Sequence, residues 1–221
     1  MLAKLTEGGH KVIVLARHAS ALPPGRQLIA IDIDLADAAT VRETGRQLAA
    51  EHPGISVLIN NAALQYGKPL TDPGFDPARM ADEVAINLTA PALLTHALLP
   101  PLRANGPRAA IVNVSSGLAL FPKQATALYC ATKAALSNFT RSLRYQLAAN
   151  GVLVSEVVLP LVDTPMTTGR GTGKISADTA AAAILAGITA RRDIIYVGKA
   201  RLLPILARLA PGIGHRMLRG S

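Results

Sequence analysis

Two polar side chains stand four residues apart in an otherwise apolar, alanine-rich stretch. They are Tyr129 and Lys133, within the segment SSGLALFPKQATALYCATKAA that covers residues 115–135. On a helix, residues four apart project from one face, one turn from each other. A phenol loses its proton near pH 10, and a neighbouring ammonium stabilises the phenolate and lowers that pKa. The spacing therefore predicts a tyrosine suited to acid–base chemistry, with Lys133 lowering its pKa.

A serine hydroxyl precedes this pair by thirteen residues. Ser116 follows the β-branched run AAIVNVS, so we expect it at the carboxyl end of a strand. In open parallel sheets the ligand crevice lies at that end of the strands. We expect Ser116 to donate a hydrogen bond to a substrate oxygen, while Tyr129 gives or takes the hydroxyl proton as hydride moves at carbon.

The elements that must position these residues follow an alternating pattern. Short β-branched runs alternate with longer helical patterns, which is typical of βαβ units and a parallel sheet. The expected strands cover residues 11–16, 27–33, 55–60, 109–115, 152–159 and 193–197. The expected helices cover residues 38–51, 79–103, 125–149 and 177–190. The prediction is an α/β, doubly wound parallel sheet forming one domain over residues 1–221.

The composition excludes several classes of protein. Half of the 221 residues are apolar, enough for a buried core. The net charge of +9 permits an anionic partner, but the chain has no Trp and its arginines are scattered, so no nucleic-acid partner is expected. A single Cys130 excludes an internal disulfide, and no Cys/His spacing indicates a metal. No uninterrupted apolar run reaches about 18 residues and no signal peptide is evident, which predicts a cytoplasmic protein.

The C-terminal segment ARLLPILARLAPGIGHRMLRG mixes leucine and isoleucine with arginine at near-helical spacing. Pro204 and Pro211 interrupt it. A helix lying on a membrane surface is one interpretation. Packing on the domain or on a partner subunit, with the arginines facing water, fits the pattern better, so membrane contact is not expected.

Together these motifs resemble the short-chain dehydrogenase/reductase superfamily, and within it the DltE-like oxidoreductases. The likeness rests on INLTAPALLTHALLPPL, IVNVSSGLALFP, YCATKAAL and SLRYQL, and it covers nearly the whole chain. It implies a Rossmann-like fold, a homo-oligomer, and hydride transfer between NADP(H) and a carbonyl compound or secondary alcohol. It also implies catalytic roles for Ser116, Tyr129 and Lys133. Asn87 completes a proton relay in that family, where a local disturbance of its helix lets it hold a water beside the lysine.

The resemblance further implies a nicotinamide cofactor along the carboxyl ends of the strands. Asp34 matches an aspartate that contacts adenine, and the LINNAA turn, with Ala63 where glycine is usual, lies against the adenosine half and the central sheet. Backbone groups of Val162 and the hydroxyl of Thr164 would reach the nicotinamide. The implied cofactor-binding residues are Asp34, Leu35, Asn60, Asn61, Ala62, Tyr129, Lys133, Val162 and Thr164.

The end of the first expected strand indicates which cofactor is used. Arg17 and His18 stand there, with no carboxylate before Asp32. A carboxylate at this position binds the ribose hydroxyls of NAD, whereas a 2′-phosphate requires a cation. Arg17 therefore favours NADP, and NAD is the alternative.

One part of the family pattern is not found. MLAKLTEGGHKVIV resembles the end of the helix after the phosphate loop, so the first strand and glycine-rich loop are expected upstream of Met1. That strand is central in the usual order, and its absence exposes two sheet edges. One hypothesis is a truncated reading of a longer active enzyme. Another is a chain that closes the gap into one continuous six-strand sheet.

The substrate and the competing functions follow from these observations. Residues 118–121, 161–173 and the C-terminal tail are mostly apolar, which predicts a small hydrophobic carbonyl or alcohol substrate. Glycines 169, 171 and 173 indicate a mobile flap on the substrate side.

The alternative function is a catalytically impaired fragment of this fold, or a binding or regulatory protein lacking the phosphate-binding loop. A serine hydrolase is excluded because VSSGL lacks the G-x-S-x-G pattern.

Overall fold

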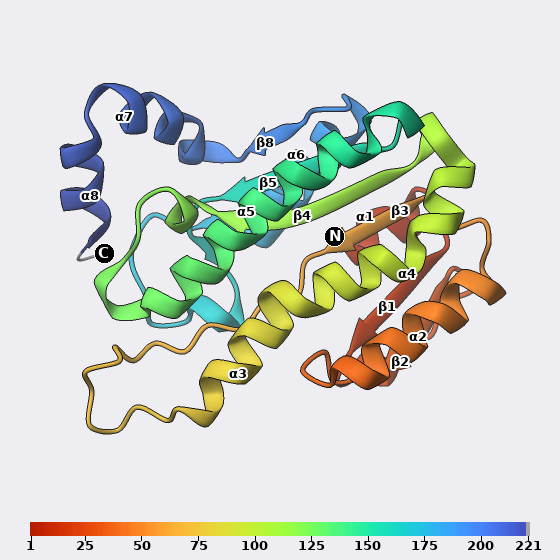
Figure 1. The fold of residues 1–221 in the computed structure, drawn as a ribbon, viewed down its shortest axis with the longest axis horizontal. Helices are drawn as coiled ribbons and strands as arrows, with labels where there is room; N and C mark the ends of the chain where they lie inside the picture. The colour runs from red at the N-terminus through yellow and green to blue at the C-terminus, as the bar shows by residue number, and fades with distance from the viewer. Residues whose placement is uncertain (220–221) are drawn as a thin grey trace.

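The computed structural model describes residues 1–219, whose strands form two main sheets (Figure 1). The first sheet pairs β1 (Val12–Ala16) with β2 (Leu28–Asp32). The second has the order β3 (Val57–Asn60), β4 (Ala110–Ser116), β5 (Leu153–Leu159), β8 (Ile194–Tyr196), and all of these neighbours run parallel. A short third pair joins β6 (Val162–Asp163) to β7 (Ile175–Ser176). The predicted parallel α/β class is confirmed, and each of the six expected strands is present.

The two main sheets remain separate. Within the described chain, β1 and β3 are not hydrogen-bonded to each other, so the single continuous sheet considered from the sequence is wrong. All five residues of β1 are only partly buried, although an apolar run such as VIVLA is typical of a strand buried on both faces. Val57, at the start of β3, is 43% exposed. Both strands therefore carry free edges that can accept another strand.

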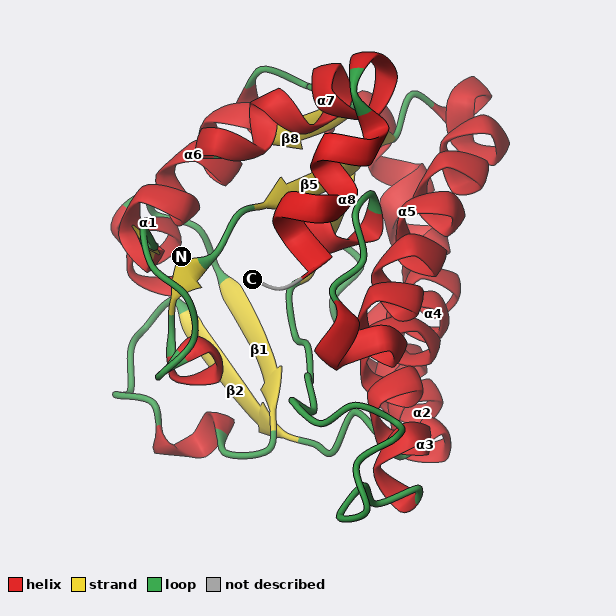
Figure 2. Ribbon diagram, turned by 90° about the vertical axis from the view of Figure 1, so that its left-hand side faces the viewer, coloured by secondary structure: helices red, strands yellow, loops and turns green. Residues whose placement is uncertain are grey.

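Helices cover both faces of the strands, as expected of a doubly wound fold (Figure 2). One side carries α2 (Ala38–Glu51), α4 (Ala90–Asn105) and α5 (Ala127–Leu147), and the other carries α1 (Leu2–Glu7) and α6 (Ala177–Thr189). Helix α3 (Ala78–Val84) continues into α4 through a π-helical segment, Ala85–Thr89. Helices α7 (Leu203–Leu209) and α8 (Pro211–Arg219) follow β8.

The central strand β4 shows how the sequence divides the core. Successive side chains of a strand point to opposite faces. Val112 and Val114 join the apolar cluster of β8 and α6, whereas Ile111 joins the cluster formed with α2, α4 and α5. Asn113 and Ser115 share the face of Ile111, so two polar side chains lie buried toward α5. This alternation brings the polar end of β4 against the N-terminal half of α5.

The helical stretch Ala78–Arg108 is long and apolar enough by length and composition to cross a membrane. No uninterrupted apolar run in the sequence predicted this stretch. Core helices of water-soluble proteins share both properties, so length and composition alone carry little weight. Here Leu94, Leu98 and Leu102 are buried in the cluster that contains Val41 of α2. We therefore interpret the stretch as a core element.

Candidate active site

Ser116 is the last residue of β4 and caps the short turn that follows. Its Oγ accepts a hydrogen bond from the backbone N–H of Leu118 at 3.2 Å. The serine is half-buried, and its hydroxyl has no acceptor among the described residues. The O–H therefore stays available to donate to a molecule at the carboxyl end of the sheet.

Tyr129 and Lys133 lie one turn apart on α5, as the spacing predicted. Lys133 Nζ is 5.6 Å from the centroid of the Tyr129 ring. The same ammonium donates a hydrogen bond at 2.8 Å to the carbonyl oxygen of Val114, two residues before Ser116 on β4. This bond ties the helix that carries the phenol to the strand that carries the serine. The structure thus brings Ser116, Tyr129 and Lys133 to one junction between β4 and α5.

Burial controls the ionisation of the phenol. Desolvation raises the pKa of Tyr129 to about 12, with further increases from Cys130 and Glu83 and a partial decrease from Arg170. The net pKa of Tyr129 is therefore raised, so the expectation of a lowered pKa is wrong for this structure. The physical reasons are that burial outweighs the nearby charge and that the ammonium is directed at the Val114 carbonyl. Tyr129 is a neutral phenol at physiological pH, which suits a proton donor.

The same burial acts on the lysine in the opposite direction. Lys133 is 2% exposed, and desolvation lowers the pKa of its ammonium from 10.5 to about 8. The charged form still predominates at pH 7, because its folded-state pKa lies above that pH. A buried charge with one carbonyl partner is costly to the fold, so its retention is explained better by chemistry than by stability.

Asn87 lies in the π-helical segment, which is the local helix disturbance that the family resemblance implied. Its side chain accepts a hydrogen bond from the backbone N–H of Leu64 and donates one to the Leu64 carbonyl, both at 2.8 Å. The amide also donates to Thr132 Oγ1 at 3.1 Å, one residue before Lys133. Asn87 therefore connects the π-helical segment between α3 and α4, the loop after β3, and Thr132 on α5.

We expect the substitution Asn87→Leu to destabilise the protein strongly. It removes both partners of the Leu64 backbone in a fully buried position, and each unsatisfied group costs about 1 to 3 kcal/mol. Urea unfolding should show a loss of about 3 kcal/mol, with Asn138→Leu on the exposed face of α5 as the control. An unfolding free energy equal to that of the wild type would show that Leu64 finds other partners.

A chain of buried polar side chains extends from β3 to α5. Asn60 Nδ2 donates to Asn113 Oδ1 at 2.7 Å, and Asn113 Nδ2 donates to Thr140 Oγ1 at 2.9 Å. Asn60 and Asn113 are also direct neighbours in the β3–β4 register. The resemblance placed Asn60 beside the adenosine half and the central sheet, and its side chain is engaged within the sheet. Sequence reasoning missed Asn113 and Thr140, although the polar residue inside the buried run AAIVNVS was a usable signal.

Glu83 is a second residue that sequence reasoning missed. It lies one helical turn before Asn87, is 2% exposed, and has an Oε1 atom with no hydrogen-bond partner within residues 1–219. Burial raises the pKa of this carboxyl, and the backbone N–H of Tyr66 partly offsets the increase. Glu83 and Tyr129 line the same small cavity, together with Tyr66 and Phe75. A buried carboxyl thus borders the phenol, and its charge affects the ionisation of Tyr129.

Glu83→Gln should stabilise the protein at neutral pH but not at low pH. A carboxyl with a raised folded-state pKa destabilises the fold as pH rises above its unfolded value of 4.5, because the buried group must then ionise. Urea unfolding between about pH 4 and pH 8 should show the variant and the wild type diverging as pH increases. Asp82→Asn, an exposed neighbour, should show no such divergence. Parallel curves for wild type and Glu83→Gln would contradict the burial of this charge.

The expected adenosine-side residues follow β1, β2 and β3. Arg17 is exposed and has no ion-pair or hydrogen-bond partner within the described chain. Asp34 Oδ1 accepts from the Ala36 N–H at 2.9 Å, which forms a turn after β2 with the partly buried Leu35. Asn61 and Ala62 are exposed after β3. All five residues therefore lie beyond the carboxyl ends of these strands, where a nucleotide could contact them.

Ala63 has a negative φ, because Arg191 is the single non-glycine residue with a positive φ in the described part of the chain. The alanine in the LINNAA turn therefore causes no backbone strain. The family's glycine at this position is not required by the conformation that the turn adopts here.

The expected nicotinamide-side residues lie in the segment after β5. Val162 is buried in β6, and its carbonyl accepts a hydrogen bond from Thr167 Oγ1 at 2.6 Å. Thr164 caps the following turn together with Thr167. Farther along, Arg170 Nη1 donates to Gln65 Oε1 at 2.5 Å, so the glycine-rich segment reaches the loop after β3. This contact explains why Arg170 acts on the pKa of Tyr129.

A nucleotide cofactor fits these residues at its two ends. The exposed cation Arg17 suits a phosphate on the ribose, and the Thr164 hydroxyl and Lys133 suit a nicotinamide and its ribose. Residues 1–219 do not supply a glycine-rich turn between a strand and a helix that could hold the pyrophosphate. Among the same residues, no group of three or more His, Cys, Asp or Glu side chains is placed to hold a metal.

A larger cavity lies on another side of α5. Its walls are residues of the turn after β4, of α5 and of α8, including Leu118, Ala131 and His215, and they do not include Ser116 or Tyr129. The expected contribution of the turn and the C-terminal tail to a pocket is thus seen, but away from the phenol. The smaller cavity is lined by Tyr129 and Glu83, whereas Ser116 and Lys133 are not among its lining residues.

Comparisons with known proteins agree with this arrangement. A family model described as short chain dehydrogenase matches residues 1–174. The uncharacterized oxidoreductase DltE of Bacillus subtilis (strain 168) is 36% identical over 165 residues, covering 73% of this chain and 65% of that protein. The inactive hydroxysteroid dehydrogenase-like protein 1 of Homo sapiens is 28% identical over 172 residues, covering 74% of this chain and 52% of that protein. The chain thus spans between about half and two thirds of these relatives' length.

A solved structure is similar over the whole described fold. The short chain dehydrogenase from Burkholderia cenocepacia J2315 in complex with NADP has a TM-score of 0.88 and 28% identity to this chain. The match covers 100% of this chain and 91% of that chain. The likeness supports the doubly wound Rossmann-like arrangement described above.

Proposed function

The chain belongs to the short chain dehydrogenase family, and from that premise we propose that it transfers hydride between NADP(H) and a carbonyl compound or secondary alcohol. The observation that supports the proposal is the hydrogen bond from Lys133 to the Val114 carbonyl, which joins the helix of Tyr129 and Lys133 to the strand that ends at Ser116. Single-domain organisation over residues 1–221 and a cytoplasmic location are part of the same proposal.

In the direction of reduction, each side chain has a defined task. NADPH supplies the hydride that adds to the carbonyl carbon. The Ser116 hydroxyl donates a hydrogen bond to the carbonyl oxygen, and Tyr129 transfers its phenolic proton to that oxygen as the alcohol forms. Tyr129 holds this proton at neutral pH because burial raises its pKa to about 12. In alcohol oxidation the same groups work in reverse.

Lys133 and Asn87 support the proton transfer. Loss of the phenolic proton leaves a phenolate, and the Lys133 ammonium is the nearby cation that stabilises it. Asn87 contacts Thr132 and the Leu64 backbone, which supports its proposed place in a relay that returns a proton toward the lysine. In this proposal Lys133 and Asn87 act through Tyr129 and do not contact the substrate, whereas Ser116 does.

For the cofactor, we expect Arg17→Ala to weaken NADPH binding about tenfold or more and to leave NADH binding unchanged. The free guanidinium at the end of β1 would form charge-assisted hydrogen bonds to the 2′-phosphate, which NADH lacks. Fluorescence titration with both cofactors measures the effect, with the exposed Arg26→Ala as the control. Equal weakening for NADPH and NADH would assign Arg17 another role and favour NAD.

The substrate proposed is a small hydrophobic carbonyl compound or alcohol. Leu70, Phe75 and Leu128 give the cavity at Tyr129 an apolar part, and Lys68, Glu83 and Thr126 line the rest together with tyrosines. A homo-oligomer is proposed through α4 and α5, and the 71% exposed Tyr145 on α5 supports that surface.

A second candidate is a binding or regulatory protein of the same fold that does not turn over. Two observations favour it: residues 1–219 lack a pyrophosphate-binding turn, and the edges of β1 and β3 are free. A relative whose name describes it as inactive is also 28% identical to this chain.

Titration of the purified 221-residue chain with NADPH distinguishes the two candidates. If the chain is an oxidoreductase, NADPH should bind saturably with a dissociation constant in the micromolar range. Addition of a panel of apolar ketones and aldehydes should then oxidise the NADPH. Saturable binding without oxidation of NADPH by any compound favours the regulatory protein. A chain that folds but does not bind NADPH would contradict a cofactor site assembled from these residues alone.

A further inference from the structure

The C-terminal part of the chain exposes apolar and cationic side chains together. Leu202, Ile205, Leu209 and Ile213 are 63%, 58%, 76% and 56% exposed, and they are four of the nine large apolar residues exposed in the described chain. Five cations accompany them, none in an ion pair within residues 1–219. We call these nine residues the C-terminal surface: Lys199, Arg201, Leu202, Ile205, Arg208, Leu209, Ile213, Arg216 and Arg219.

The opposite side of the same segment is packed against the protein. Leu203 occupies the space over Gly117, where an added Cβ would lie 2.6 Å from its Cδ1. Gly214 is buried directly against the Phe121 ring, which also meets the His215 ring edge-on with 5.2 Å between centroids. Helices α7 and α8 are therefore docked through one face. The exposed apolar side chains form a second face that the fold itself does not use.

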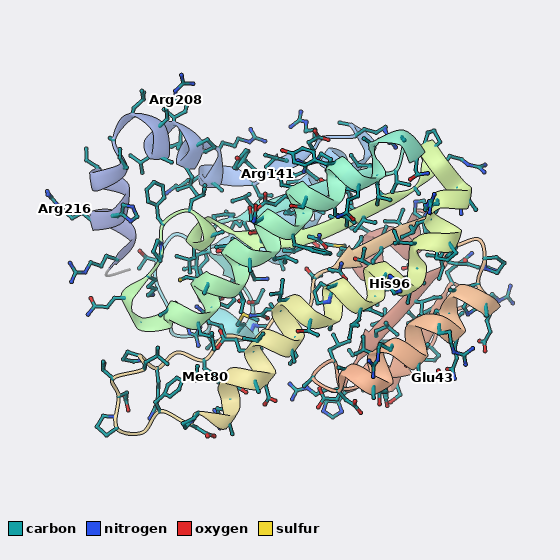
Figure 3. All side chains as sticks on the ribbon, viewed as in Figure 1. Glu43, Met80, His96, Arg141, Arg208 and Arg216 are labelled. Carbon is teal, nitrogen blue, oxygen red and sulfur yellow. The ribbon has the colours of Figure 1, made fainter. Side chains whose placement is uncertain are left out.

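The exposed residues are aligned along one direction. Ile205 and Leu209 are four residues apart on α7, and Leu202, at the end of the preceding 3-10 turn, lies three residues before Ile205, so the three form one stripe. Ile213 lies in the first turn of the next helix, which begins at Pro211. Arg208 and Arg216 both extend away from the body of the molecule, at the end where α7 and α8 lie (Figure 3). The surface thus presents an apolar stripe bordered by outward-facing cations.

Charge decides what can cover this surface. After Asp193 the chain contains five Lys or Arg residues and no Asp or Glu. A two-fold contact between copies through this face would bring like charges together, because such a contact joins identical patches. An anionic lipid surface has phosphate groups that can bind the cations. Just beneath them it has an apolar layer that can bury the leucine and isoleucine side chains.

We propose that the C-terminal surface docks the protein on the face of an anionic lipid bilayer. Leu202, Ile205, Leu209 and Ile213 enter the boundary between headgroups and acyl chains, and the arginines bind lipid phosphates. This contact is peripheral, and none of the nine residues lines the cavity at Tyr129, so it is separate from the proposed catalysis. It also differs from the sequence-based expectation that the arginines only face water.

Vesicle co-sedimentation of the full chain tests the proposal. Vesicles containing about one third phosphatidylglycerol should bind the wild type, and pure phosphatidylcholine vesicles should bind it at least about tenfold less. The double variant Ile205→Ser/Leu209→Ser should lose at least about tenfold in partition coefficient, because two exposed apolar side chains no longer enter the lipid. Leu70→Ser, which removes an exposed leucine elsewhere, should bind as the wild type does.

A second pair of variants tests the charges. Arg208→Gln/Arg216→Gln should weaken binding to the anionic vesicles severalfold and reduce its salt sensitivity. The exposed pair Arg103→Gln/Arg141→Gln, on α4 and α5, should do neither. Circular dichroism confirms that each variant is folded. Wild-type and Ile205→Ser/Leu209→Ser chains that bind vesicles equally, or a wild type that does not bind, overturn the proposal. Light scattering provides a further outcome. If the wild type forms a dimer that Ile205→Ser/Leu209→Ser disrupts, and does not bind vesicles, the surface contacts a second copy of the chain and the proposal is overturned.

Discussion

Tyr129→Phe is expected to lower the rate of NADPH-dependent carbonyl reduction by about a thousandfold. General acid catalysis by a positioned side chain contributes about 10² to 10⁴ in rate, and Phe keeps the ring while removing the proton that the substrate oxygen must receive. Ser116 still donates a hydrogen bond, but it cannot replace a buried phenol already held beside the lysine. NADPH affinity should stay within about twofold, because the ring and its packing are unchanged.

The measurement is steady-state NADPH oxidation with an apolar ketone, together with NADPH titration of each variant. Tyr145→Phe removes the same hydroxyl from an exposed position on the same helix and serves as the matched control. It should match the wild type in both measurements. If Tyr129→Phe kept more than about a tenth of the wild-type rate, another acid would have to supply the proton.

Lys133→Met is expected to stabilise the folded chain by about 2 kcal/mol at pH 7 while removing activity. The lowered pKa of about 8, against an ordinary 10.5, corresponds to about 3 kcal/mol of destabilisation by the buried ammonium. The hydrogen bond to the Val114 carbonyl is lost in the variant, which offsets about 1 kcal/mol of the gain. Methionine fills a similar volume without a charge, so a stabilised but inactive variant indicates a residue kept for chemistry.

The pH dependence gives this prediction a definite sign. Because the folded pKa of Lys133 is lowered, its penalty is complete below about pH 8 and is relieved as pH rises through 8 to 10.5. The stability advantage of Lys133→Met should therefore shrink over that interval, by at most about 1.4 kcal/mol per pH unit. Urea unfolding at several pH values measures it, with the exposed Lys68→Met as the control. An advantage that stays constant with pH, or its absence at pH 7, would contradict a buried charged lysine.

The sequence predicted the elements and the central residues because both depend on local pattern. Short β-branched runs located all six strands, and the four-residue spacing put Tyr129 and Lys133 on one helical face. The strand-end position of Ser116 followed from the same reasoning. Such features are determined within a few residues of chain, so they can be deduced without coordinates.

What the sequence could not predict depends on tertiary burial. The direction of the Tyr129 pKa shift is opposite to the expected one, because burial of the phenol dominates it, and the charges of Glu83 and Arg170 that also act on it come from distant parts of the sequence. The Asn60–Asn113–Thr140 chain joins three elements through a register that no local pattern specifies. The apolar stripe on α7 became evident only because Leu203 and Gly214 show which face is packed.

The most direct test of the proposed chemistry follows the transferred hydrogen itself. NADPH deuterated at the transferable position of its nicotinamide would be incubated with the chain and an apolar ketone, and the alcohol product would be examined by mass spectrometry. We expect one deuterium on the carbinol carbon with the wild type, and none above background with Tyr129→Phe over the same time. NADPH bound by the wild-type chain with no label reaching any alcohol would contradict hydride transfer at the Ser116, Tyr129 and Lys133 junction.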